Sequence, residues 1–209
     1  MNWERFEDDP LYSEIFTYWY DEWNSISEEV KNGMIGINIV NIRVVLLDII
    51  NEYELNQFES ENNRKVYIKL IETLISKKYI NIFQDENIEW IGNEVSCGVG
   101  MQRIDIMLSV VRNDNKVCMP IELKSTEAYL EITKQVQRYI DWLKQYYLPN
   151  RPSDLEPMII SRQIQNKSQQ NYLDLVQEFN TFNTQNNLRL RYVEFNVVNQ
   201  DINFQEVIY

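Results

Sequence analysis

The sequence predicts an α/β or α+β domain, with a mixed central sheet flanked by helices and a helical extension at its N-terminus. Hydrophobic residues make up 44% of the 209 residues, as in ordinary globular proteins. Apolar residues recur with helical and then with strand periodicity along residues 65–209. Two apolar runs, 103–112 and 117–124, flank a polar turn at 113–116 and therefore predict a β-hairpin.

The expected extension, residues 1–64, is acidic and aromatic. It holds 14 acidic and 4 basic residues, hence a net charge of −10, whereas residues 65–209 hold 18 and 16, hence −2. We expect helices over 13–23 and 37–53, the second because its apolar residues have the three-and-four spacing of an amphipathic helix. The polar stretch 52–64 is the expected domain boundary. We expect this extension to form a homodimer interface or to bind a protein partner.

The core, residues 65–209, is expected to alternate helices and strands. Its first helix spans 65–78, and a strand over 88–97 ends at Gly98 and Gly100. After the hairpin, a helix over 131–147 ends before Pro149. The remaining predicted elements are a strand over 157–162, a helix over 168–179 and a strand over 188–198.

The predicted hairpin brings three charged side chains to one patch of sheet. If Arg112 and Val117 close the turn, Asp105 lies across from Lys124 and diagonal to Glu122. Alternate side chains of a strand share a face, so these three charges point away from the core. The core face is then formed by the apolar residues of both strands: Ile104, Ile106, Leu108, Val110, Val117, Met119, Ile121 and Leu123.

The available side chains limit the chemistry of any active site. The chain has no histidine, which excludes Ser-His-Asp, Cys-His and zinc-histidine sites. Cys97 and Cys118 lack metal-ligand spacing and are expected in the core. Two carboxylates and a backbone carbonyl offer the hard oxygen ligands that magnesium prefers. A neighbouring lysine can orient or deprotonate water, or offset charge on a phosphate, so the pattern suits phosphodiester hydrolysis.

Arg103-Ile104-Asp105, followed after sixteen residues by Glu122-Leu123-Lys124, resembles the D…E-x-K signature of the PD-(D/E)xK nuclease superfamily. The glycines before Arg103 and the helix after Lys124 are similar to the RecB-like and archaeal Holliday-junction-resolvase branches. This resemblance implies a restriction-endonuclease-like fold: a core helix, a three-stranded meander, a second helix and a further strand.

The resemblance also implies a Mg²⁺-dependent deoxyribonuclease, with Mn²⁺ as a substitute. Asp105, Glu122 and the Leu123 carbonyl would bind the metal, and Lys124 would activate or position water. A first-helix acid is expected to complete the site, and Glu72 is the one acid within 65–78. The supporting residues that match the family pattern, or are expected to contact DNA, are Gln135 (with Gln137 as an alternative), Tyr139 and Arg103.

Other interpretations stay open. The acid-x-lysine pattern also occurs at Glu29 and Asp114, so the charges at Glu122 and Lys124 could form a structural ion-pair cluster. An acidic protein-binding module, or a non-catalytic subunit that retains the fold, is a further alternative. The choice between DNA and RNA, and between endonuclease and exonuclease, is open. We expect an intracellular protein, because the first residues do not show the basic and then apolar pattern of a secretory signal, and no apolar window is long enough to span a membrane.

Overall fold

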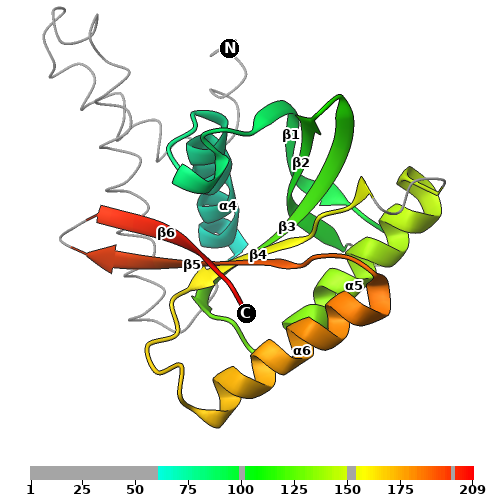
Figure 1. The fold of residues 1–209 in the computed structure, drawn as a ribbon. Helices are drawn as coiled ribbons and strands as arrows, with labels where there is room; N and C mark the ends of the chain where they lie inside the picture. The colour runs from blue at the N-terminus through cyan, green and yellow to red at the C-terminus, as the bar shows by residue number, and fades with distance from the viewer. Residues whose placement is uncertain (1–60, 99–101, 150–153, 199–200) are drawn as a thin grey trace, which may run out of the picture.

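The computed structural model describes residues 61–98, 102–149, 154–198 and 201–209. Within them, six strands form one mixed sheet in chain order (Figure 1). The first three form an antiparallel meander, the third to fifth run parallel, and the sixth returns antiparallel to the fifth. The strands are β1 (Asn87–Ser96), β2 (Arg103–Arg112), β3 (Asn115–Glu127), β4 (Met158–Arg162), β5 (Arg191–Val198) and β6 (Asp201–Val207).

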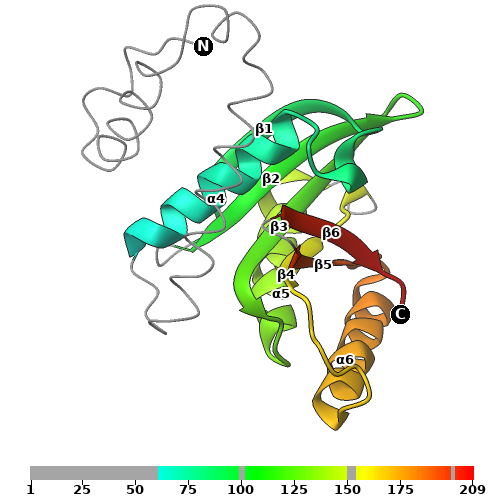
Figure 2. The ribbon, with the colours of Figure 1, turned by 90° about the vertical axis from the view of Figure 1, so that its left-hand side faces the viewer.

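Helices cover both faces of this sheet, so the predicted mixed sheet flanked by helices is confirmed. α4 (Glu61–Ser76) lies on one face, and α5 (Ile132–Trp142) and α6 (Gln170–Asn186) lie on the other (Figures 1 and 2). α5 and α6 make the crossovers between the parallel strands, as parallel pairing requires. A π-helical turn, η3 (Leu143–Tyr147), continues α5, and a short 3₁₀ helix, η2 (Asn81–Phe83), precedes β1.

The side chains of the sheet divide between two apolar clusters. The first packs against α4 and includes Ile106, Leu108, Val110, Met119, Ile121 and Leu123. The second packs against α5 and α6 and includes Ile104, Met107, Cys97, Cys118, Ile159 and Tyr192. The strand alternation placed Ile104 in the first cluster, which is wrong. The expectation that the charged side chains lie outside the core is wrong too, because the helices that link parallel strands bury the second face of the sheet as well.

The hairpin turn between β2 and β3 is shorter than expected, so the predicted register is wrong. Arg112 pairs with Asn115 rather than with Val117. Asn113 and Asp114 form the turn, both with positive φ (50° and 63°), as a two-residue type I′ turn requires. Because the shift is two residues, the paired residues still alternate between the two faces as predicted. The ladder between β2 and β3 ends at Ile106 opposite Ile121, so Asp105 lies at the level of Glu122 and not of Lys124.

Other boundaries differ modestly from the prediction. α6 continues to Asn186, where Asn187 ends it in the left-handed conformation, and β6 was not predicted. The expected helices at 13–23 and 37–53 lie outside the described residues. α4 already begins at Glu61, so Arg64 belongs to its first turn. No helix in the described segments is long and apolar enough to cross a membrane.

Candidate active site

Two buried carboxylates lie side by side on β2 and β3, and we call Asp105 and Glu122 the acidic pair. Their exposed fractions are 2% and 0%. Asp105 Oδ2 accepts a hydrogen bond from the Leu123 backbone N–H at 2.9 Å, and its Oδ1 lies 2.5 Å from the Arg64 guanidinium. Glu122 Oε2 accepts a hydrogen bond of 2.6 Å from the Tyr139 hydroxyl of α5. The hairpin, α4 and α5 therefore position the acidic pair.

Lys124 completes a closed ring of contacts with α5. Its Nζ lies 2.9 Å from Glu122 Oε1 and 3.5 Å from Gln135 Oε1. Gln135 in turn donates a hydrogen bond of 3.0 Å to the Tyr139 hydroxyl, which donates to Glu122. Gln135 and Tyr139 can act together because residues four apart share a face of a helix. The ring holds the ammonium and the carboxylate in fixed positions.

One oxygen of the acidic pair has unused bonding capacity. Glu122 Oε1 is buried and close to the Lys124 ammonium, yet no donor reaches it in hydrogen-bond geometry. The ammonium forms an ion pair with this oxygen without a hydrogen bond, because a hydrogen bond requires alignment as well as a short distance. A buried carboxylate oxygen without an aligned donor is unusual, and this oxygen can therefore accept a further interaction.

Burial and neighbouring charges raise the pKa values of three groups at the site. Burial, followed by the charge of Glu122, raises the pKa of Asp105 to about 7, against the opposing effect of Arg64. Burial acts to lower the pKa of Lys124, but the Glu122 carboxylate outweighs it and the pKa lies above its usual value. Burial and Glu122 also raise the pKa of Tyr139, which keeps its hydroxyl a donor.

The raised pKa of Asp105 predicts an unusual pH dependence of stability for the metal-free protein. Between about pH 4 and pH 7 the unfolded carboxyl loses its proton while the folded one keeps it. Relative to Asp105→Asn, the free energy of unfolding of the wild-type chain should fall by about 1.4 kcal/mol per pH unit in this window and level off above it. Urea unfolding of both proteins across this range measures the difference. If the free energies of unfolding of the two proteins changed with pH in parallel, the raised pKa of Asp105 would be contradicted.

Two of the sequence-predicted residues lie apart from the acidic pair. The Glu72 carboxylate accepts hydrogen bonds from Lys69 and Asn93, and Arg103 forms an ion pair with Glu94. In the described part of the chain, no group of three or more carboxylates and thiolates gathers in a metal-binding arrangement. Any roles of Glu72 and Arg103 stay predictions.

The structure places Gln135, and not Gln137, beside the acidic pair. Gln137 bonds to Asp141 and to Asn186 of α6, whereas Gln135 bonds to Lys124 and Tyr139.

Sequence reasoning missed two residues that contact the site. Arg64 was assigned to the extension, although a base at the start of an amphipathic helix was a possible signal. Tyr129 lies in the segment before α5, and the Lys124 ammonium lies 5.6 Å from its ring centroid. Tyr129 is 47% exposed, so it borders the site on the solvent side.

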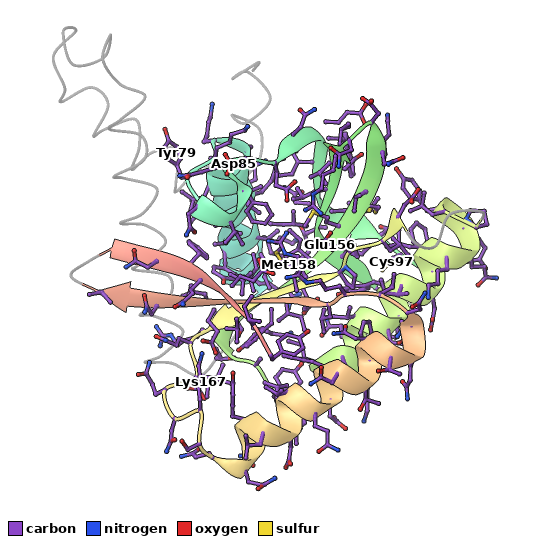
Figure 3. The ribbon with its side chains drawn as sticks, in the orientation of Figure 1. Tyr79, Asp85, Cys97, Glu156, Met158 and Lys167 are labelled. Carbon is purple, nitrogen blue, oxygen red and sulfur yellow. The ribbon has the colours of Figure 1, made fainter. Side chains whose placement is uncertain are left out.

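A second polar cluster continues across the neighbouring parallel strands. Glu194 is 3% exposed, accepts a hydrogen bond of 3.2 Å from Tyr192 and lies 2.7 Å from the Lys167 ammonium. The Tyr192 hydroxyl is 3.0 Å from Ser161 Oγ. Lys167 lies in the loop between β4 and α6 (Figure 3). Glu194 interrupts the apolar run at 188–198, a signal that was available in the sequence.

Comparison with known proteins gives little beyond this geometry. No protein-family model matches the chain. No curated protein matches it. A solved structure, that of Pyrococcus furiosus SfsA in complex with Ca²⁺, is similar at 12% sequence identity and a TM-score of 0.38. The match covers 66% of this chain and 62% of that one, so it spans less than two thirds of SfsA.

Proposed function

We propose that the chain is a metal-dependent nuclease that hydrolyses phosphodiester bonds, with DNA as the expected substrate. The observation that carries this proposal is the burial of Asp105 and Glu122 side by side next to Lys124 on a rigid sheet. Burying like charges together is costly, and such clusters occur preferentially at functional sites. The same three residues carry the resemblance to the PD-(D/E)xK signature.

The residues present fit a divalent cation. The acidic pair and the Leu123 carbonyl would supply oxygen ligands, the set that Mg²⁺ and Mn²⁺ prefer, and water and substrate would supply the rest. Glu122 Oε1 has no aligned donor, and the repulsion that raises the pKa of Asp105 would be relieved by a cation. When bound, such an ion supplies a Lewis acid for the phosphoryl group and for water.

The chain's own residues have separate roles in this proposal. Lys124, whose pKa lies above its usual value, stays protonated, which favours stabilising charge on the phosphate over removing a proton from water. Tyr139 and Gln135 hold Glu122 and Lys124 in the orientation that this requires. The Leu123 N–H holds Asp105 in place.

The main rival is a structural cluster of ion pairs. When both carboxylates are ionised, Arg64 and Lys124 balance the charges of the acidic pair, so the site is then neutral without a ligand. Incubating the purified chain with linear, circular, nicked, single-stranded and branched DNA, and with RNA, in Mg²⁺ separates the two. Cleavage supports the proposal. A lack of cleavage of every substrate would favour the structural or protein-binding alternatives, and cleavage that appears only with an added partner would indicate a subunit.

The identity of the metal gives a further prediction. Mg²⁺ and Mn²⁺ should support cleavage, whereas Ca²⁺, which is larger and less demanding in geometry, should allow DNA binding with little turnover. Excess chelator should reduce cleavage to the background of a Glu122→Gln control. Parallel cleavage assays with each ion test this, and activity that persists in chelator would contradict the proposal.

A further inference from the structure

Arg64 forms an ion pair with a carboxylate oxygen that a divalent cation would need as a ligand. Its guanidinium lies 2.5 Å from Asp105 Oδ1, while Asp105 Oδ2 already accepts the Leu123 N–H. Arg64 comes from α4, on the opposite face of the sheet from the α5 residues that hold Glu122. Each carboxylate of the acidic pair thus has one oxygen beside a cation of the chain: Asp105 Oδ1 beside Arg64, and Glu122 Oε1 beside Lys124.

The two cations at the site differ in how exposed their side chains are. Lys124 has a side chain only 10% exposed and lies against Gln135 and the ring of Tyr129. The Arg64 side chain is 32% exposed and projects from the first turn of α4. A long, partly exposed side chain can exchange its partner at little desolvation cost. Arg64 is therefore the cation that can leave.

We propose that Arg64 and a divalent cation compete for Asp105, and that the displaced guanidinium binds a phosphate group of the substrate. This inference rests on the proposed function. A doubly charged ion on the acidic pair repels the guanidinium and replaces its attraction to Asp105. The planar guanidinium has paired donors that match a phosphate as well as they match a carboxylate. Arg64 would thus limit metal binding before the substrate arrives and hold the substrate afterwards.

The test uses two affinities that should change in opposite directions. Arg64→Gln should bind Mn²⁺ about tenfold more tightly by calorimetry, because the competing cation is gone. It should bind a fluorescent oligonucleotide about tenfold more weakly in Ca²⁺, with a salt dependence reduced by about one phosphate contact. Working at about pH 8.5, above the Asp105 pKa of about 7, favours the ionised carboxylate in the wild-type chain, and repeating the titration at higher pH shows whether protonation affects the variant. Arg189→Gln, which removes an exposed arginine paired with Glu206, is the matched control.

Arg64→Lys covers the case in which the glutamine variant folds poorly. Lysine keeps the charge but not the paired donors, so its Mn²⁺ affinity should lie between those of the wild type and Arg64→Gln. If both affinities of the Arg64 variants fall together, or Mn²⁺ affinity does not change, Arg64 is a structural support and the inference is overturned. A wild-type chain that binds no Mn²⁺ would overturn the proposed function itself, and the inference with it.

Discussion

Glu122→Gln and Asp105→Asn should each lower the cleavage rate by at least about a thousandfold while leaving the protein folded. Both changes remove a negative charge that the proposed cation needs and keep the volume of the side chain. The amides are better probes than alanine, because both carboxylates are buried and truncation would leave a cavity and, at Glu122, an unpaired Tyr139 hydroxyl.

Single-turnover cleavage in Mg²⁺, with thermal unfolding as the check on folding, measures this effect. Glu131→Gln is a matched control, because it removes a carboxylate whose side chain is 70% exposed. It should cleave at the wild-type rate. Near-wild-type cleavage by either Glu122→Gln or Asp105→Asn would show that cleavage does not require the acidic pair.

Lys124→Met should lower the rate of the chemical step by about a hundredfold or more, because the ammonium is expected to stabilise charge on the phosphate. Methionine keeps most of the apolar stem, so packing against Tyr129 changes little. Lys134→Met, at a side chain 67% exposed, serves as the control for loss of a positive charge. The comparison requires single-turnover rates at saturating metal. A Lys124→Met rate within a few fold of the wild type would leave Lys124 with only a structural role.

The sequence predicted the strands of the hairpin better than their register. β2 has the predicted bounds, 103–112, because apolar periodicity is a local property of the chain. The register depends on the turn, and Asn113-Asp114 is a weaker signal for a two-residue turn than Asn-Gly. The error did not disturb the site, because a shift of two residues preserves the faces of both strands.

Much of the candidate site could be predicted, because its residues lie on two local patterns. The acidic pair and Lys124 share one hairpin, and Gln135 and Tyr139 share one helical face. Arg64 could not be placed, since it reaches Asp105 across a separation of 41 residues that depends on how α4 crosses the sheet. The burial of the charges was missed for a similar reason: strand alternation does not reveal that α5 covers the second face.

Anomalous diffraction from crystals of the wild-type chain grown or soaked with Mn²⁺ is the most direct test of a divalent cation site at the acidic pair. We expect a manganese peak bound by both the Asp105 and the Glu122 carboxylates, and no such peak in Glu122→Gln crystals treated in the same way. Wild-type crystals in which these two carboxylates bind no manganese, with Arg64 and Lys124 still paired to them, would contradict the account.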